Sequence, residues 1–332
     1  MKVCVVGAGA IGGFVAARLA KAGNEVSVIL RNQNLKAVHS SGLRLIEQDG
    51  TSFVSKLRAT DKISEAGIQD LVVLAVKSHQ VAEVAADIAT LFHQDTRVVT
   101  MQNGIPWWFF QGMGGEFEGR RLASVDPTGQ ASTHIAQQRI IGSVVYPAAE
   151  VIEPGVVKVI DGNRFSLGEP GARSDFLSVV SKVFIEAGFK APIARDIRAE
   201  IMVKVLGNMS FNPVSALTHA TLEGICLHPN ARALIASLMA EGLAICDRLG
   251  IRVGVSIEQR IAGAQAVGHH KTSMLQDVEA GRRLELEALV ASMVELGQIT
   301  GVPTPQLQTI YALADLLAQN LSSKQGRLAM TT

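Results

Sequence analysis

The chain has 332 residues, of which 48% are hydrophobic and 18% charged, and its formal net charge is +1. This length allows two domains with cores of their own, and the hydrophobic content excludes a disordered chain. A charge so close to zero provides no overall field that would attract nucleic acid or an anionic membrane, so an anionic ligand must be held by local groups. We therefore expect a soluble, cytoplasmic globular protein that binds neither nucleic acid nor membranes.

The cysteines and histidines predict neither a disulfide framework nor a metal site. Cys4, Cys226 and Cys246 are far apart and form no Cys-x-x-Cys motif, which is typical of buried thiols in a reducing compartment. Only His269 and His270 are adjacent, and adjacent side chains diverge on a helix. No segment reaches the roughly 18 uninterrupted apolar residues expected of a membrane helix.

A glycine-rich loop near the start predicts a dinucleotide site. Residues 2–6 read as a short buried strand, a helical pattern then runs to about residue 22, and 25–30 read as a second strand. The motif is specific because a strand precedes the loop and a helix and a second strand follow it. Its glycines allow a tight turn and the close approach of a pyrophosphate. The alternative is a purely structural turn. The residues we expect at the cofactor are Gly7, Ala8, Gly9, Ala10, Ile11 and Gly12.

The residue after the second strand predicts which nicotinamide cofactor is bound. An NAD site usually supplies Asp or Glu there for the ribose hydroxyls. This chain has Arg31 followed by Asn32, and an arginine suits a 2'-phosphate. We therefore predict NADP(H), with an ordinary surface charge as the alternative reading of Arg31.

Polar side chains follow two further predicted strands, at residues 70–77 and 96–104. They are Lys77, Gln80 and Asn103. Ligands of doubly wound sheets bind outside the carboxyl ends of the strands, so we expect these three side chains at the cofactor site. Strand ends are often polar for structural reasons, which is the alternative.

Regular elements fill the rest of the first half, apart from an aromatic, glycine-rich segment at residues 105–130, in which the aromatic residues are 107–110. The latter fits a core, a cover over the pocket or a dimer interface. From residue 196 onward the pattern is helical, so we expect a Rossmann domain at 1–195 and an all-helical domain at 196–332. The expected elements are a hairpin at 43–57, strands at 140–151, 155–160, 164–167 and 190–195, and a helix at 174–187.

A polar stripe in the second half indicates a reaction centre. Lys204, Asn208 and Asn212 are four residues apart within a mostly apolar run, so on a helix they lie on one face. Burial would lower the pKa of the lysine toward the range of a proton donor. Pro213 predicts that the helix kinks or ends there. Ser273 with Gln276 three residues later matches a capping box, which would give Ser273 a structural role.

Together these motifs resemble, in order and over nearly the whole chain, the ketopantoate reductase (2-dehydropantoate 2-reductase) family. The resemblance implies an α/β Rossmann-type nucleotide-binding domain followed by an all-α C-terminal domain like that of 6-phosphogluconate dehydrogenase. The motifs are Gly7-Ala8-Gly9-Ala10-Ile11-Gly12, Arg31, Val76-Lys77-Ser78-His79-Gln80, Gln102-Asn103-Gly104, Lys204-Val205-Leu206-Gly207-Asn208-Met209-Ser210-Phe211-Asn212-Pro213, and Ser273-Met274-Leu275-Gln276-Asp277 followed by Glu285.

The resemblance also implies a role for each site residue. Lys204 would be the general acid of ketone reduction, with Glu285 as the second catalytic residue. Asn103, Asn208, Asn212 and Ser273 would hold the substrate, whereas Arg31, Lys77, Gln80 and Asn103 would face NADP(H). The chain departs from the family at Met202, where members commonly carry Trp, and in Leu284-Glu285-Leu286-Glu287, where they commonly carry Thr-Glu-Ile-Asp. Both departures bear on substrate specificity.

The sequence therefore predicts an oxidoreductase that reduces a 2-keto acid with NADPH, with 2-dehydropantoate as the expected substrate and pantothenate biosynthesis as its setting. Two alternatives stay open. One is an NADP-dependent reductase of a different keto or hydroxy acid, and the other is a non-catalytic NADP(H)-sensing protein. The expected partner is a small keto acid, and a homodimer is left open.

Overall fold

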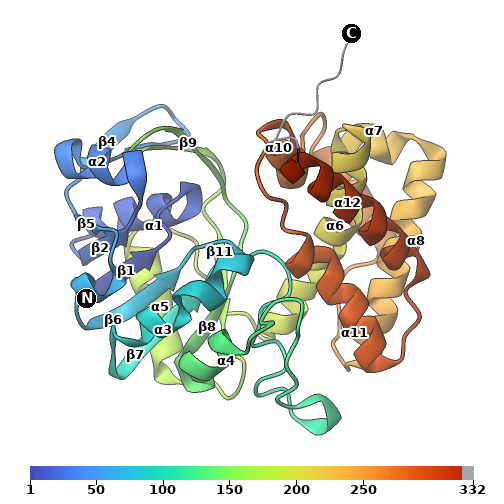
Figure 1. The fold of residues 1–332 in the computed structure, drawn as a ribbon, viewed down its shortest axis with the longest axis horizontal. Coiled ribbons are helices and arrows are strands. Elements are labelled where there is room, and N and C mark those ends of the chain that lie inside the picture. Colours follow the sequence, from blue (N-terminus) through green and yellow to red (C-terminus); the bar gives the residue numbers. More distant parts are fainter. Residues whose placement is uncertain (324–332) are drawn as a thin grey trace. The chain divides into compact units, whose positions relative to one another are not determined.

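A computed structural model describes residues 1–323 of the chain, and Figure 1 draws its fold. Contacts between residues divide the chain into two units, Met1–Ile197 and the residues from Arg198 onward. The division falls after the first residue of helix α6 (Ile197–Thr218).

The first unit is built on a seven-stranded sheet in the order β11-β8-β7-β6-β1-β2-β5. All neighbouring strands pair in parallel except β11, which is antiparallel to β8. From β5 to β8 this is the doubly wound order of a Rossmann fold, with β1 at the switch point, which confirms the expected class. The strands are β1 (Lys2–Val6), β2 (Glu25–Ile29), β5 (Arg58–Thr60), β6 (Gln69–Leu74), β7 (Phe92–Thr100), β8 (Ile140–Val145) and β11 (Phe165–Gly168).

A second, four-stranded sheet in the order β4-β3-β10-β9 packs against helix α1 (Ala10–Lys21). The hairpin expected at residues 43–57 is present as β3 (Leu43–Ile46) and β4 (Ser52–Ser55), and it joins β9 (Ala148–Glu153) and β10 (Val156–Asp161). Helix α1 also contacts β1 and β2 of the large sheet. Because protein surrounds α1 on both sides, its sequence is apolar around most of its circumference.

The remaining helices of the first unit are short. They are α2 (Asn32–Ser41), α3 (Val81–Ala89), α4 (Gln130–His134) and α5 (Asp175–Glu186), together with the 3-10 turns η1 (Ile63–Ala66), η2 (Ser78–Gln80), η3 (Gly115–Phe117) and η4 (Gln137–Arg139). Helix α5 begins one residue after and ends one residue before the predicted bounds of 174–187.

Two strand predictions differ from the structure. Residues 140–151 form two strands, β8 and β9, separated by Tyr146 and Pro147, because a proline cannot donate to a sheet ladder. The strand expected at 190–195 was wrong: this segment makes only isolated bridges, of Lys190 to Arg164 and of Ile193 to Leu167.

The aromatic run at residues 106–110 belongs to the core. Trp108 is 1% exposed and Trp107 3% exposed, and Phe109 and Phe110 are fully buried. The indole Nε1 of Trp108 donates a hydrogen bond of 3.1 Å to Oγ1 of Thr100 at the end of β7. Of the three alternatives for this run, which were a core, a cover over the pocket and a dimer interface, the structure therefore supports the core.

The second unit is helical in the part that the structure describes, as expected. A single π-helical segment, η5 (Glu287–Ala291), precedes α11. The helices are α6 (Ile197–Thr218), α7 (Leu222–Leu227), α8 (Pro229–Arg248), α9 (Ile257–Ala266), α10 (Ser273–Glu279), α11 (Ser292–Thr300) and α12 (Pro305–Ser323).

Two local predictions for this unit need correction. Helix α6 continues through Pro213 to Thr218, so of the predicted kink or end, the end is wrong; the proline removes one backbone donor. The N-cap of α10 is Thr272, whose side chain accepts a hydrogen bond from Leu275 N at 3.2 Å. Ser273 is thus the first helical residue and makes no capping box, because the adjacent threonine already occupies the cap position.

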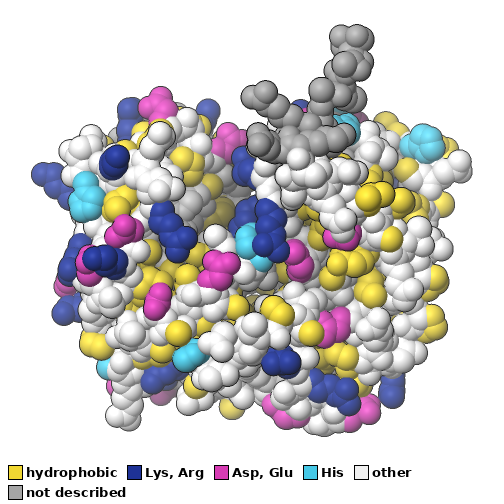
Figure 2. All heavy atoms as spheres, in the orientation of Figure 1, with side chains coloured by type: hydrophobic (Ala, Val, Ile, Leu, Met, Phe, Trp, Pro, Cys, Tyr) yellow, Lys and Arg dark blue, Asp and Glu magenta, His cyan; other side chains and the backbone are white. Residues whose placement is uncertain are grey.

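Charged side chains of both signs are interspersed on the face drawn in Figure 2, as expected for a net charge of +1. Among residues 1–323, no helix combines the length and apolar character that crossing a membrane requires.

We expect replacement of Trp108 by Phe to destabilise the protein more than replacement of Trp107 by Phe. Both changes remove a similar volume from the core, but only Trp108 donates a hydrogen bond, since Nε1 of Trp107 has no partner within the described residues. The difference in unfolding free energy should be about 1 kcal/mol. Thermal melts of the two variants measure it, and equal melting temperatures would contradict the assignment.

Candidate active site

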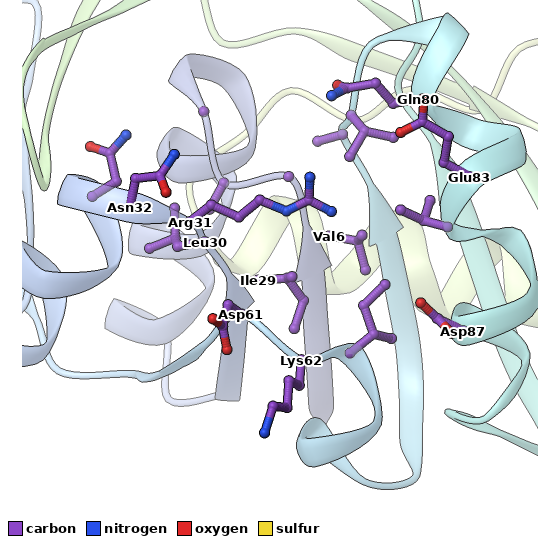
Figure 3. A pocket seen from close by; sticks show the side chains of 18 of the residues that line it. Val6, Ile29, Leu30, Arg31, Asn32, Asp61, Lys62, Gln80, Glu83 and Asp87 are labelled. Carbon is purple, nitrogen blue, oxygen red and sulfur yellow. The ribbon is translucent and has the colours of Figure 1, made fainter.

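A pocket of about 970 Å³ lies at the carboxyl ends of β1, β2 and β6 in the first unit (Figure 3). It is the position at which a doubly wound sheet binds its ligand. Six of the residues expected at the cofactor line it: Gly7, Ala8, Gly9, Arg31, Lys77 and Gln80. Ala10, Ile11 and Gly12 lead from the loop into α1, and Asn103 is not among the lining residues.

The glycine loop has the geometry of an anion cradle. Gly7 has φ +92°, a conformation that side chains rarely adopt, and a Cβ on Gly12 would overlap the carbonyl oxygen of Gly7. Among the residues that the structure describes, no side chain caps the N-terminus of α1, and its first turn holds no acid. Unfilled backbone N–H groups and the helix dipole favour a phosphate there. The loop therefore fits a pyrophosphate.

Arg31 begins the wall of the pocket next to β2, and its side chain extends over the pocket toward the strand that carries Val6 (Figure 3). Strand β5 pairs with β2 so that Thr60 is opposite Ile29. Asp61 and Lys62, which follow β5, therefore emerge near the end of β2 and also line the pocket. The sequence reading missed both, because β5 has only three residues and has no periodicity to read.

The opposite wall is formed by the segment that follows β6. The side-chain oxygen of Gln80 accepts a hydrogen bond from Lys77 N at 3.2 Å, and Gln80 N donates to the carbonyl of Lys77 at 2.9 Å. Gln102, after β7, donates from Nε2 to the carbonyls of Leu74 and Val76 at 2.8 and 3.0 Å. These bonds fix the backbone that carries Lys77. Asn103 follows Gln102 directly, beside this tie between the two strand ends.

Lys204 lies in the second turn of α6, where neighbouring side chains remove it from water. Met202, Val205 and Leu206 are buried around it, whereas Lys204 itself keeps a small exposed fraction. Burial lowers the pKa of Lys204 from its ordinary value to about 8, and the negative charge of Glu285 opposes this shift. The amine is thus poised to give up its proton near neutral pH.

Glu285 lies two residues before the π-helical segment, and its backbone is held by buried neighbours. Leu284 is 2% exposed and Leu286 4% exposed, and Glu287–Ala291 form the π-helix. Segments of this kind are rare and occur often at functional sites. The structure therefore brings Glu285 within electrostatic reach of Lys204, across more than eighty residues of sequence.

Three further residues predicted to bind the substrate lie on two helices of the second unit. Asn208 and Asn212 share α6 with Lys204, Asn208 being partly exposed and Asn212 only 5% exposed. Ser273 is exposed in the first turn of α10. Among residues 1–323, no group of three or more His, Cys, Asp or Glu side chains could hold a metal ion.

The strand order, the glycine loop and the buried lysine are the features of an oxidoreductase with a Rossmann-type domain. Comparison with known proteins gives the family. The ketopantoate reductase PanE/ApbA family matches residues 3–171, and its C-terminal domain matches residues 196–318. The chain belongs to the ketopantoate reductase family of oxidoreductases.

Individual relatives span almost the whole chain. A protein of Mesorhizobium japonicum named 2-dehydropantoate 2-reductase is 49% identical over 320 residues, which cover 96% of this chain and 98% of the relative. The crystal structure of a candidate ketopantoate reductase from Ralstonia solanacearum MolK2 has a TM-score of 0.92 and 41% identity, over 96% of this chain and 98% of the other. D-mandelate dehydrogenase with NADH and anilino(oxo)acetate shares the fold, at a TM-score of 0.82 and 22% identity over 97% of this chain and all of the other.

The pKa of Lys204 can be measured without any assay of activity. We expect NMR titration of ¹³Cε-labelled lysine to give about 8 for Lys204, and a lower pKa in Glu285→Gln, because Glu285 raises it. Glu279→Gln is the matched control, since Glu279 pairs with the exposed Lys271 at 2.8 Å. A Lys204 pKa that stays the same in Glu285→Gln would contradict the proposed coupling.

Proposed function

We propose that the protein reduces a 2-keto acid to the 2-hydroxy acid with NADPH, with 2-dehydropantoate as the substrate and Lys204 as the general acid. The observation that carries this proposal is a partly buried lysine with a pKa of about 8 coupled to Glu285, on a chain that also has a dinucleotide pocket. The substrate is inferred from the name of the Mesorhizobium japonicum relative. Pantothenate biosynthesis in the cytoplasm is the setting that this activity implies.

In the proposed reaction, the glycine loop and the N-terminus of α1 hold the pyrophosphate of the cofactor, and Arg31 and Lys77 provide positive charge along the pocket. When bound, the reduced nicotinamide supplies the hydride for the ketone carbon. Gln80 supports Lys77 through the hydrogen bonds of its side chain and backbone.

Lys204 donates a proton to the ketone oxygen as negative charge develops on it. With a pKa of about 8, about nine in ten of these amines are protonated at pH 7, and transfer of the proton is still easy. Glu285 keeps the amine charged against the effect of burial. Asn103, Asn208, Asn212 and Ser273 are proposed to orient the substrate with amide and hydroxyl hydrogen bonds.

Replacement of Lys204 by Ala should lower kcat by at least about 100-fold and leave NADPH binding unchanged, because a positioned proton donor contributes a factor of this order. In the unaltered enzyme kcat/KM should fall as pH rises through about 8, since only the protonated amine can donate. Loss of NADPH absorbance measures both effects, and fluorescence titration checks the binding of the cofactor. Near-normal turnover by Lys204→Ala would refute the assignment.

A panel of 2-keto acids separates the proposed substrate from the alternatives. Highest kcat/KM with 2-dehydropantoate supports the proposal. Faster turnover of a bulkier or aromatic keto acid would identify a reductase of another acid on this scaffold, as the fold shared with D-mandelate dehydrogenase allows. Tight NADPH binding without turnover of any member would favour a sensing protein.

The preference for NADP(H) rests on Arg31, but Asp61 supplies a specific reason to test NAD(H). Asp61 lines the same pocket as Arg31, and a carboxylate there could accept hydrogen bonds from ribose hydroxyls. We expect Arg31→Ala to raise the KM for NADPH about tenfold and to change that for NADH little, because a charge-assisted bond to the 2'-phosphate is lost. NAD(H) would be assigned as the cofactor by the opposite outcome. In that case Arg31→Ala leaves the KM for NADPH unchanged, and Asp61→Asn raises the KM for NADH.

A homodimer stays a prediction. The ketopantoate reductase of Staphylococcus aureus, which shares this fold, is described as dimeric, and sedimentation of the purified protein would test this chain.

A further inference from the structure

We propose that Gln102 is a positioning residue of the cofactor site, which acts on the bound dinucleotide through the peptide unit between Val76 and Lys77. Gln102 follows strand β7 and is not among the residues that line the pocket, whereas Val76 and Lys77 are. The proposal rests on the binding of a nicotinamide dinucleotide in this pocket, and not on the identity of the keto acid.

The side chain of Gln102 reaches from the end of β7 to the end of the neighbouring strand β6. Its Nε2 donates hydrogen bonds of 2.8 Å to the carbonyl of Leu74 and of 3.0 Å to the carbonyl of Val76. A side-chain amide has two N–H donors, so both are in use. The backbone bond from Met101 N to the carbonyl of Leu74, 3.0 Å long, precedes these two. Gln102 therefore continues the link between β6 and β7 past the ends of both strands.

A second glutamine holds the other side of the same peptide unit. The N–H of Lys77 donates to the side-chain oxygen of Gln80 at 3.2 Å, while the carbonyl of Val76 accepts from Gln102. In a trans peptide, which this one is, the N–H and the carbonyl point in opposite directions. Gln80 lines the pocket (Figure 3), so the N–H is on the side of the pocket and the carbonyl is on the side of β7. Rotation of this unit by half a turn would bring a carbonyl oxygen to the pocket side, where it would repel a phosphate.

The glycine loop rests directly on this segment. A Cβ on Gly7 would lie 2.7 Å from Val76 N and 3.0 Å from the carbonyl carbon of Ala75. One on Gly12 would lie 3.0 Å from Cβ of Ala75. Ala75 N also donates to the carbonyl of Val6 at 2.9 Å, which joins the segment to β1. Contacts this close transmit a shift of Val76 to the loop that faces the pyrophosphate.

Stability alone does not explain an amide at position 102. Oε1 of Gln102 is buried and has no hydrogen-bond partner within residues 1–323, and a buried acceptor without a partner costs free energy. What the amide provides is its pair of donors, which fix the wall under the glycine loop before the cofactor arrives. A site held in its binding geometry in this way loses less free energy to ordering when the ligand binds.

The chain contains a matched control at the other end of β6. Gln69 begins this strand, and its Nε2 also donates to two carbonyls, those of Ala66 at 2.8 Å and Gly67 at 3.3 Å. Oε1 of Gln69 likewise has no partner in the part of the chain that the structure describes. Leu74 lies about 16 Å further along the strand. Replacement of Gln69 therefore removes the same kind of bonds away from the pocket.

Two replacements at each glutamine test the role. Met keeps the size of the side chain without the amide, and the ionised carboxylate of Glu accepts hydrogen bonds but cannot donate them. Fluorescence titration with NADPH and with NADH gives the Kd of each cofactor, and thermal melts report on folding. Steady-state kinetics with the keto acid that the unaltered enzyme reduces best separates KM from kcat.

We expect Gln102→Met to raise the Kd of the preferred cofactor about tenfold, the effect of about one net hydrogen bond on an equilibrium constant. Gln102→Glu should raise it further, because a carboxylate would repel the two carbonyls. The kcat at saturating cofactor and the KM for the keto acid should stay near their unaltered values. Gln69→Met and Gln69→Glu should lower the melting temperature to a similar extent and leave the Kd unchanged.

An unchanged Kd in Gln102→Met would overturn the proposal, and so would an equal rise in Gln69→Met, which would assign both effects to stability. A raised KM for the keto acid with an unchanged cofactor Kd would also overturn it, in favour of an action through the adjacent Asn103. The titrations need no keto acid. A protein that reduces none of them would contradict the proposed function and leave this test intact.

The unaltered protein offers a measurement that does not depend on the folding of a variant. If Gln102 stabilises the form that binds the cofactor, the bound cofactor must stabilise the bonds of Gln102 to the same extent. NMR of protein labelled with ¹⁵N-glutamine should show slower exchange of the Gln102 side-chain amide with water when NADPH is bound, and unchanged exchange of the Gln69 amide. Equal exchange of the Gln102 amide with and without the cofactor would count against the proposal.

Discussion

The constraint on which the second unit depends is the burial of an amine in an apolar helix. Removing the charged amine of Lys204 from water costs free energy, which lowers its pKa to about 8, and the negative charge of Glu285 offsets part of this cost. Both requirements determine local sequence. Most of α6 around Lys204 is apolar, and Leu284 and Leu286 anchor the backbone of Glu285 on either side. A carboxylate that could move away would let the pKa of the amine fall further.

The first unit depends on a different constraint, which is the space available around α1. The helix starts at the glycine loop and is enclosed between the large sheet and the four-stranded sheet. A Cβ on Gly12 would meet the loop, and one on Gly13 would meet Val157 of β10 at 2.8 Å. The four-stranded sheet therefore helps to position α1, whose uncapped N-terminus lies at the pocket.

Local patterns predicted much of this arrangement. The strand, glycine loop and helix at residues 2–21 followed from periodicity, and the spacing of Lys204, Asn208 and Asn212 placed them on one helix. Contacts between distant segments could not be read in the same way. The hairpin at β3 and β4 was predicted, but not its pairing with β10 more than a hundred residues later. Asp61 and Lys62 reach the pocket only because β5 pairs beside β2. Ser273 was predicted to cap α10, but Thr272, one residue earlier, takes the cap position. Serine and threonine are both good cap residues, so the sequence alone does not decide between them.

The departures from the family pattern can also be judged from their places in the second unit. Met202 is two residues before Lys204, about 200° around the helix, and it is fully buried. Its side chain therefore points away from the face that carries Lys204 and Asn208, so an exchange of Trp for Met there changes packing within the unit. Leu284 and Leu286 flank Glu285 but are themselves buried, so they position the carboxylate and leave its chemistry unchanged. Lys204 and Asn208 lie on the partly exposed face of α6, whereas Met202, Leu284 and Leu286 are buried.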